Sequence, residues 1–233
     1  MPDNKVYSRR EVLKIVAQRL LSHRSEIWKY PLDQRHPFSL IGLEKTDDSK
    51  ENLKKLLVFS LQFRGGPRLP LKEVDKSLLA FDATYDRITE QILPNFNGQR
   101  STDLIYGCMI SNIPNIGPKI TGVFLRDLVY HLGIWKELRE FLYLPIDRHI
   151  HSLLVNRLKV FQEKETPRVG ESYFTKKNQD FQTEMSAIHR PRVDFDDLWF
   201  IGSNFCTFIK LCPICWIRDL CRNRHDNATK LSL

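Results

Sequence analysis

Apolar residues near the N-terminus recur at helical spacing. Between Val12 and Leu20 they fall at the intervals that place side chains on one face of a helix. Ser8 and Glu11, three positions apart and directly before this repeat, form the sequence signature of a capping box. The pattern therefore predicts a first helix from about Arg9 to Ser22.

Most of the remaining chain shows the same spacing. The predicted helices are 53–63, 72–81, 85–93, 103–111, 119–132, 134–141, 149–158 and a stretch around 195–208. Strict alternation of apolar and polar residues, which marks half-buried strands, is scarce. The segment 162–182 is polar, has no clear periodicity and contains Pro167 and Gly170, so we expect a loop or insertion there. The sequence therefore predicts an all-α protein.

Length and composition are sufficient for a folded core. With 233 residues, of which 42% are hydrophobic, the chain can build one large domain or two modest ones. Its N-terminus opens with polar residues, and no run of about 18 apolar residues follows. We therefore expect a globular cytoplasmic protein with no membrane span, in a compartment that keeps thiols reduced.

The charge balance is basic. Lys and Arg together number 36 and Asp and Glu 28, which gives a formal net charge of +8. Such an excess suits a polyanionic partner such as nucleic acid. It is equally compatible with a soluble basic protein that has no such partner, so charge alone does not decide between them.

Cysteine is concentrated in one block near the C-terminus. Four of the five cysteines follow the pattern Cys206-x5-Cys212-x2-Cys215-x5-Cys221, and Cys108 stands apart. Four close thiols are the ligand set of an iron-sulfur cluster, which this pattern favours. Zinc is the alternative, although structural zinc sites usually show two separated C-x2-4-C pairs, and ordinary buried or disulfide-bonded cysteines are a further one.

Basic residues are interleaved with this block. Lys210 and Arg218 lie between its cysteines. If the cysteines fold around a metal, we expect these side chains to give the loop a basic face toward a polyanion. A solvated rim with no partner is the alternative.

A short connection between two predicted helices has the composition of an anion-binding hairpin. It reads Ile113-Pro114-Asn115-Ile116-Gly117-Pro118-Lys119. Glycine adopts positive φ freely and asparagine tolerates it, while proline suits the first position of a helix. Such a connection can direct backbone N–H groups and the positive end of a helix at a phosphate, whereas an ordinary helix-helix turn is the alternative.

The order of three segments resembles that in a known family. The hairpin, the segment Ile146-Asp147-Arg148-His149 and the cysteine block occur as they do in helix-hairpin-helix base-excision DNA glycosylases, and the whole looks like the endonuclease III branch. The family hairpin L-P-G-V-G-R-K-T-A matches residues 113–121 in register, and the family segment V-D-T-H matches 146–149. Residues 58–62 are similar to the family segment L-L-S-A-Q. The resemblance covers about 53–221.

The resemblance implies roles for individual residues. It places Lys119 on the lysine that attacks the sugar and Asp147 on the catalytic carboxylate. It places Gln62 on the glutamine that enters the space left by an everted base. The remaining implied roles are contacts to DNA, by Asn115, Ile116, Gly117, Lys210 and Arg218, and ligation of a 4Fe-4S cluster, by Cys206, Cys212, Cys215 and Cys221.

The resemblance also implies the architecture, which is an all-α, two-domain helix-hairpin-helix glycosylase fold with a 4Fe-4S cluster loop. Residues 53–158 would form a central helical barrel that contains the hairpin. Residues 1–52 and 159–233 would combine in a second helical domain that carries the cluster, with the active cleft between the two domains.

Departures from the pattern of the endonuclease III branch leave the excised base open. The first cysteine gap is one residue shorter than the family's usual gap, and Asn115 replaces the first glycine of the hairpin. The interval of 28 residues from Lys119 to Asp147 is closer to that of the archaeal 8-oxoguanine glycosylases, which lack the cluster. Pro145, two positions before Asp147, also resembles those enzymes.

The expected function follows from these roles. A glycosylase must rotate the damaged nucleotide out of the duplex to reach its C1′ atom. The resemblance implies a monomeric enzyme, associated with the nucleoid, that removes a damaged and we expect oxidised base from double-stranded DNA and cleaves the strand through a lysine Schiff base. The alternatives are a monofunctional glycosylase acting on mismatched or deaminated bases and a non-catalytic, metal-stabilised DNA-binding module.

Overall fold

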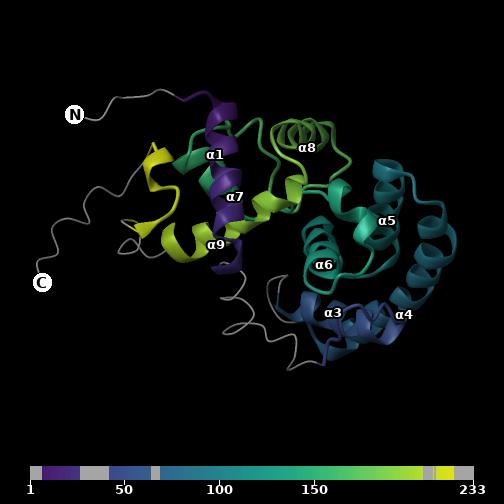
Figure 1. The fold of residues 1–233 in the computed structure, drawn as a ribbon. Coiled ribbons are helices and arrows are strands. Elements are labelled where there is room, and N and C mark those ends of the chain that lie inside the picture. Colours follow the sequence, from purple (N-terminus) through teal and green to yellow (C-terminus); the bar gives the residue numbers. More distant parts are fainter. Residues whose placement is uncertain (1–6, 27–41, 64–68, 207–211, 213, 223–233) are drawn as a thin grey trace, which may run out of the picture. The chain divides into compact units, whose positions relative to one another are not determined.

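Helices are the predominant structure in the part of the chain that the structure describes. The computed structural model describes residues 7–26, 42–63, 69–206, 212 and 214–222. Within these residues every regular element is a helix and no strand occurs, so the all-α prediction is confirmed (Figure 1). In the same ranges, none of the helices combines the length and the apolar character that crossing a lipid bilayer demands.

The longer helices alternate with π-helical and 3-10 segments. The α-helices are α1 (Arg9–Ser22), α3 (Lys50–Phe63), α4 (Leu71–Arg87), α5 (Gly98–Asn112), α6 (Pro118–Tyr130), α7 (Arg148–Ser152), α8 (Lys176–Ile188) and α9 (Leu198–Phe200). The π-helical segments are Ile88–Ile92, Leu153–Arg157 and Ile201–Cys206. The 3-10 segments are Leu93–Asn95, Lys136–Phe141, Arg192–Asp197 and Arg218–Leu220.

Helix α1 begins and ends where the sequence predicts. The Ser8 side chain accepts a hydrogen bond from the Glu11 N–H at 3.3 Å, and the Glu11 carboxylate accepts one from the Ser8 N–H at 2.8 Å. This capping box satisfies two N–H groups that the first turn leaves without helical partners. The buried face of the helix is Val12, Leu13, Val16, Ala17 and Leu20.

The predicted break between helices 72–81 and 85–93 is wrong. Helix α4 runs without interruption through 82–84 and continues into the π-helical segment Ile88–Ile92. The stretch contains no glycine or proline before Pro94. Within it the Thr84 hydroxyl donates to the Ala80 carbonyl oxygen at 2.9 Å, a bond made inside the helix itself.

The prediction of a loop over 162–182 is wrong in its second half, because α8 begins at Lys176. Its start is capped by Thr175, whose side chain accepts from the Asn178 N–H. The buried face combines Phe181 and Met185 with two amides, Asn178 and Gln182, which hydrogen-bond to each other at 3.2 Å. Because half of the buried face is polar, the apolar spacing of this helix is not visible in the sequence.

The chain divides into two compact units. The hairpin unit contains Tyr30–Pro145 and Gly170–Tyr173, and the terminal unit contains Met1–Lys29, Ile146–Val169 and Phe174–Leu233. The domains predicted from the sequence have other boundaries, since they assign 30–52 to the second domain and 146–158 to the first. In the structure the N-terminal and C-terminal segments belong to one unit, together with α7.

Among the described residues of the hairpin unit, the α-helices α3, α4, α5 and α6 surround an aromatic core. Helix α3 packs against α4 and α6, and α5 packs against the same two helices. Tyr106, Phe124 and Trp135 are 0%, 0% and 7% exposed, so they belong to the core.

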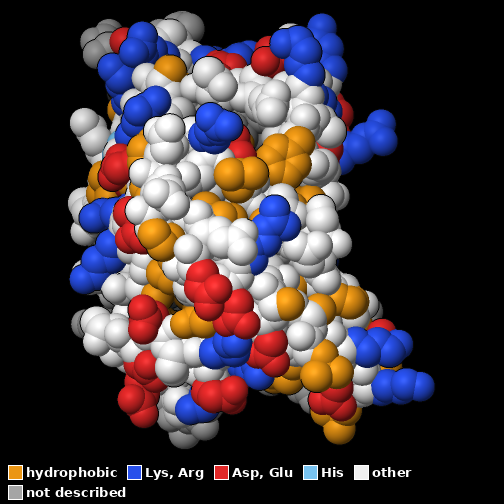
Figure 2. Space-filling view, turned by 90° about the vertical axis from the view of Figure 1, so that its right-hand side faces the viewer, with side chains coloured by type: hydrophobic (Ala, Val, Ile, Leu, Met, Phe, Trp, Pro, Cys, Tyr) orange, Lys and Arg blue, Asp and Glu red, His pale blue; other side chains and the backbone are white. Residues whose placement is uncertain are grey.

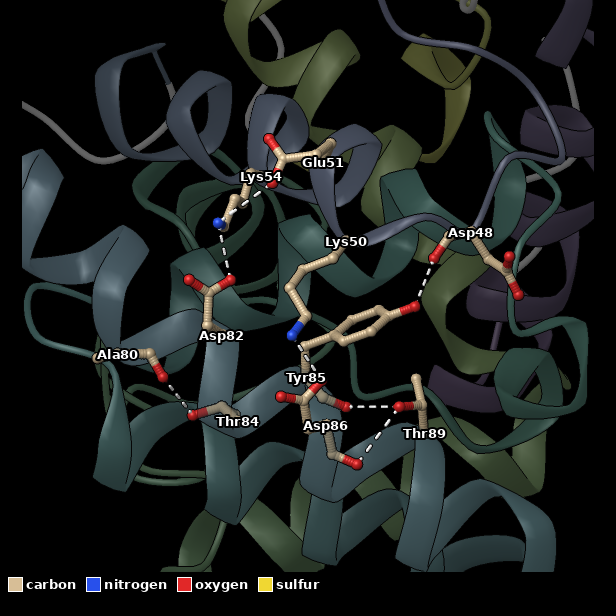
Figure 3. A network of polar contacts seen from close by, with 10 residues as sticks. All are labelled: Asp48, Lys50, Glu51, Lys54, Ala80, Asp82, Thr84, Tyr85, Asp86 and Thr89. Carbon is tan, nitrogen blue, oxygen red and sulfur yellow. Dashed lines mark hydrogen bonds and ion pairs between the residues drawn. The ribbon is translucent and has the colours of Figure 1, made fainter.

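A polar network joins α3 to α4 on the surface of this unit (Figure 3). Lys54 Nζ lies 2.8 Å from Asp82 Oδ1, and Lys50 Nζ lies 2.6 Å from Asp86 Oδ1. Tyr85 adds a hydrogen bond from its hydroxyl to the Asp48 carbonyl oxygen at 2.8 Å. Partly exposed ion pairs of this kind contribute at most about 1 kcal/mol each, so they mainly fix how the two helices are aligned.

The segment Gly170–Tyr173 belongs to the hairpin unit, although the residues before and after it belong to the terminal unit, and it completes the core of the hairpin unit. Within Gly170–Tyr173, the Tyr173 ring stacks on Tyr143 at 4.7 Å and meets Tyr106 edge-on at 5.0 Å. A Cβ atom on Gly122 of α6 would lie 2.4 Å from the Tyr173 hydroxyl oxygen and 3.1 Å from Pro145 Cβ. Only glycine fits here, because both neighbours belong to packed parts of the chain.

Helix α1 holds the terminal unit together by charged contacts as well as by its apolar face. It packs against α8 and the segment Arg192–Asp197. Arg9 pairs with Glu165 and Glu184, both at 3.0 Å. Beyond the last turn, Arg24 pairs with two carboxylates, Asp194 at 2.8 Å and Asp197 at 3.0 Å.

We predict that Gly122→Ala lowers the free energy of unfolding by about 1–3 kcal/mol, because the added methyl group overlaps the Tyr173 hydroxyl. The matched control is Gly107→Ala on α5, where an added Cβ meets no atom within 4 Å. This control should be neutral or stabilising by up to about 1 kcal/mol, since alanine favours the helix. Urea denaturation measures both, and equal stabilisation by the two substitutions would contradict the close contact at Gly122.

Candidate functional site

The four clustered cysteines line one hollow in the terminal unit. The hollow contains about 330 Å³ of space between atoms, part of which is open to solvent. Two cations and two apolar side chains complete its lining. The lining residues are Arg157, Ile201, Phe205, Cys206, Cys212, Cys215, Arg218 and Cys221.

A three-residue repeat of hydrogen bonds brings the C-terminal part of this lining to one side. The N–H groups of Cys215, Arg218 and Cys221 donate to the carbonyl oxygens three residues earlier, each at 3.1 Å. These tight turns keep the stretch compact, and Cys212, Cys215, Arg218 and Cys221 all line the hollow. The spacing was visible in the sequence, although the prediction for Arg218 considered only a contact to DNA.

Two π-helical segments supply the other side of the hollow. Cys206 ends the segment Ile201–Cys206, and Arg157 ends the segment Leu153–Arg157. The Arg157 carbonyl oxygen accepts from the Arg222 N–H at 2.9 Å, which fixes the chain directly after the last cysteine. The wider turn of a π-helix changes the direction of the side chains that follow it, and such turns are frequent at functional sites.

Glycine allows the Cys206 segment to lie close to α7. A Cβ atom on Gly202 would be only 2.7 Å from His149 Cβ and 3.2 Å from the His149 carbonyl oxygen. This contact fixes the distance between the Ile201–Cys206 segment and the helix that begins after Asp147.

Burial is the main reason that these thiols resist ionisation. Burial, with a smaller contribution from the neighbouring sulfur atoms, raises the pKa of Cys206, that of Cys215 to about 11 and that of Cys221 to about 12. Arg157 opposes the shift at Cys206 and Cys221. Since metal binding requires thiolates, a bound cation would have to displace these protons.

The donor set fits a metal group that prefers sulfur. Four thiolates around one hollow suit either an iron-sulfur cluster or zinc. As the side chains stand, no group of three or more His, Cys, Asp or Glu residues within the described ranges is arranged to hold a metal ion. Cys108 is buried in α5 and belongs to the hairpin unit, apart from the other four.

In the hairpin between α5 and α6, Asn115 is the residue that adopts the left-handed conformation, with φ +64°. The sequence suggested that Gly117 could also adopt positive φ, but its backbone is extended, with φ −97° and ψ 178°. No heavy atom lies within 4 Å of a Cβ placed on Gly117. Glycine at this position is therefore required neither by the backbone angle nor by a contact inside the protein.

Helix α4 anchors the hairpin. The Ser77 hydroxyl is fully buried and donates to the Pro114 carbonyl oxygen at 2.7 Å. The Asn115 amide nitrogen lies 3.4 Å from both Ser77 Oγ and the Glu73 carbonyl oxygen. Sequence reasoning missed Ser77, since a single serine inside a helical stretch carries no signal of a tertiary contact.

The start of α6 contains the N–H groups of a first helical turn, the kind of group that binds anions. Its N-cap is Gly117, which provides no side-chain cap, and Pro118 occupies the first position. The first intrahelical bond runs from the Thr121 N–H to the Gly117 carbonyl oxygen at 3.0 Å. The N–H groups of Lys119 and Ile120 precede that bond and lie at the positive end of the helix dipole.

The predicted site residues lie in both units. Lys119 is a partly exposed residue of α6 in the hairpin unit, where Ile116 is buried beneath the loop. Gln62 lies at the end of α3 and donates its amide to the Leu69 carbonyl oxygen at 3.1 Å. Lys210 falls outside the described residues.

Asp147 is the N-cap of α7 in the terminal unit. Its Oδ1 atom accepts from the His149 N–H at 2.8 Å and from the Ile150 N–H at 2.9 Å, and the residue is only 6% exposed. Pro145, two residues earlier, packs against Gly122, which is one helical turn from Lys119 on α6. This contact fixes the point at which the chain leaves the hairpin unit toward Asp147.

The comparisons with known proteins gave no match. No family model, no curated protein and no solved structure matches this chain. The functional argument therefore depends on the residues themselves and on the geometry described above.

We predict that Asn115→Ala lowers the free energy of unfolding by about 1–2 kcal/mol, because alanine is strained at φ +64°. Asn115→Gly should be nearly neutral, since glycine adopts this angle without strain. Gly117→Ala, at an extended and open position, should stay within about 0.5 kcal/mol of the wild type. Thermal unfolding of the three variants checks this order, and a larger loss for Gly117→Ala than for Asn115→Ala would contradict it.

Proposed function

We propose that the chain is a base-excision repair DNA glycosylase with AP lyase activity. The observation that carries the proposal is the start of α6, where an anchored hairpin, the N–H groups of the first helical turn and Lys119 occur within three residues of one another. Hydrogen-bond donors at a helix start bind phosphate, and a lysine beside them can react with the sugar attached to that phosphate.

The open position of Gly117 supports contact with an external group. Because neither its backbone angle nor an internal contact requires glycine, the absence of a side chain leaves room outside the loop. A DNA phosphate can then approach the backbone N–H groups directly. Ser77 and Asn115 hold the loop in place before DNA binds, which reduces the entropy lost on binding.

The surface charge supports DNA binding less strongly than the hairpin does. On the face drawn in Figure 2, Lys and Arg side chains stand among acidic and hydrophobic ones. The formal charge of +8 still favours a polyanionic partner over the whole molecule. The start of α6 therefore indicates better than the surface charge where a DNA phosphate would bind.

The proposed reaction uses Lys119 as the nucleophile. Its uncharged amine adds to C1′ of a flipped nucleotide, and the bond to the base breaks with the electron pair leaving on the base. The nitrogen then loses a proton, and opening of the sugar ring gives a Schiff base. Loss of a C2′ proton breaks the C3′–O bond, so the 3′ phosphate departs and the strand is cut.

Asp147 is the proposed carboxylate of this reaction. It would stabilise the positive charge that develops on the sugar and accept the proton of the attacking amine. The two backbone N–H groups bound to Oδ1 hold the carboxylate in one orientation. Gln62 would occupy the space that the flipped base leaves.

The four cysteines of the hollow are proposed to hold a 4Fe-4S cluster. With four protein ligands such a cluster has no open coordination position, and it would order the loop rather than react. Arg157 and Arg218, which line the same hollow, would offset its negative charge.

We predict that Lys119→Gln abolishes strand cleavage and the covalent enzyme-DNA adduct that borohydride traps, while the protein remains folded. Asp147→Asn should slow base release by a factor of about 10² or more, because it removes the charge that stabilises the sugar cation. Asparagine retains the helix cap, so this loss would not reflect unfolding of α7. Duplexes with single lesions, scored separately for base release and for strand cleavage, measure both effects.

The same experiment distinguishes the alternatives. An adduct that persists in Lys119→Gln would assign the Schiff base to another amine. Base release with no adduct in the wild type would identify a monofunctional glycosylase. Binding to duplex DNA without either activity on oxidised, deaminated and mismatched substrates would identify a DNA-binding module.

We predict that replacing Cys212 and Cys215 by serine removes most of the bound iron and sulfide, because two of four ligands are lost from the hollow. Cys108→Ser is the matched control, since this thiol is buried in the hairpin unit and should leave the iron content unchanged. Elemental analysis of anaerobically prepared protein gives the result. Stoichiometric zinc without iron would reject the cluster in favour of a zinc site.

A further inference from the structure

Helix α1 reaches the loop that carries three of the four clustered cysteines. Arg19 Nη1 donates to the Trp216 carbonyl oxygen at 2.7 Å and also to Asp219 Oδ1. Its Nη2 donates to Asp219 Oδ2 at 2.9 Å, so the guanidinium binds the carboxylate through both oxygens. Paired contacts of this kind fix orientation as well as distance. In Figure 1 the segment 214–222 lies beside α1.

A ring stack adds a second contact between the same two segments. The His23 ring, directly after α1, lies 4.3 Å from the Trp216 ring with only 2° between their planes. Trp216 also packs against Phe205 at 5.4 Å and Phe200 at 6.0 Å. The indole ring therefore connects α1 to the segment that precedes Cys206.

These contacts occur next to the thiols. Trp216 follows Cys215, Asp219 lies two residues before Cys221, and Phe205 precedes Cys206 and lines the hollow. Bonds from Asp219 are the main cause that raises the pKa of Arg19, and the charge of Cys215 contributes as well. The guanidinium is thus close enough to Cys215 to offset part of the negative charge that metal binding would leave there.

We propose that Arg19 and His23 of α1 are positioning residues that keep the 215–221 loop closed around the metal group held by the four thiols. This inference depends on the proposed metal centre but not on the glycosylase activity. Release of a bound metal requires the loop to open, and contacts that exist only in the closed loop lower the population of the open form.

Arg9 offers a matched control on the same helix. Its guanidinium binds two carboxylates, Glu165 and Glu184, and its side chain is 35% exposed, against 32% for Arg19. Its partners lie outside the lining of the hollow. Arg9→Ala therefore removes a comparable ion pair from α1 without touching the cysteine loop.

The test follows metal release from the full-length protein. Wild type and variants are prepared anaerobically, their iron, sulfide and zinc contents are measured, and metal transfer to an excess of chelator is timed. Arg19→Ala should release metal about 5- to 30-fold faster than the wild type, the factor expected for loss of a contact of moderate strength. Asp219→Asn and His23→Ala should also accelerate release, and Arg19→Lys should fall between Arg19→Ala and the wild type because it retains the charge but not the paired bonds.

The control separates positioning from general stability. Arg9→Ala should release metal within a factor of about two of the wild type, even if its unfolding temperature falls as much as that of Arg19→Ala. Equal acceleration by the two variants, or none in Arg19→Ala, would overturn the inference. Wild-type protein that binds no metal would overturn it together with the proposed metal centre. Faster release from Arg19→Ala in a protein without glycosylase activity would leave the inference standing and reject only the proposed function.

Discussion

The terminal unit is organised around the difficulty of enclosing four thiols in one small space. Buried thiolates lose hydration and repel one another, so they are stable only near cations. The chain supplies Arg157 and Arg218 in the lining and Arg19 beside the loop. Each cation comes from a different part of the sequence, and each is held by backbone or side-chain contacts of its own.

In the hairpin unit the main constraint is to hold the loop between α5 and α6 in place through contacts with the core and with α4. Ile113 and Ile116 are buried and so attach the loop to the core. The Ser77 hydroxyl attaches the loop to α4. Asn115 takes the left-handed conformation and also reaches α4 with its amide, so one side chain provides both the turn and an anchor. A glycine there would provide only the turn.

Features set by local chemistry could be predicted from the sequence, whereas those set by tertiary packing could not. The capping box at Ser8 fixed the start of α1, and the cysteine spacing indicated a common site. Helix α8 was missed because amides occupy half of its buried face. Ser77 was missed because its partner lies 37 residues away in sequence. Positive φ was considered for Gly117 from its residue type alone, whereas its backbone is extended and Asn115 takes the left-handed conformation.

The return of the chain at Gly170–Tyr173 means that the hairpin unit is not one continuous stretch of sequence. A fragment that ends at Pro145 would contain Gly122, Tyr106 and Tyr143 but not the ring that covers them. Its core would be left with a gap the size of an aromatic side chain. Ribosomal synthesis therefore adds the last part of the hairpin-unit core only after Ile146–Val169 of the terminal unit has been made.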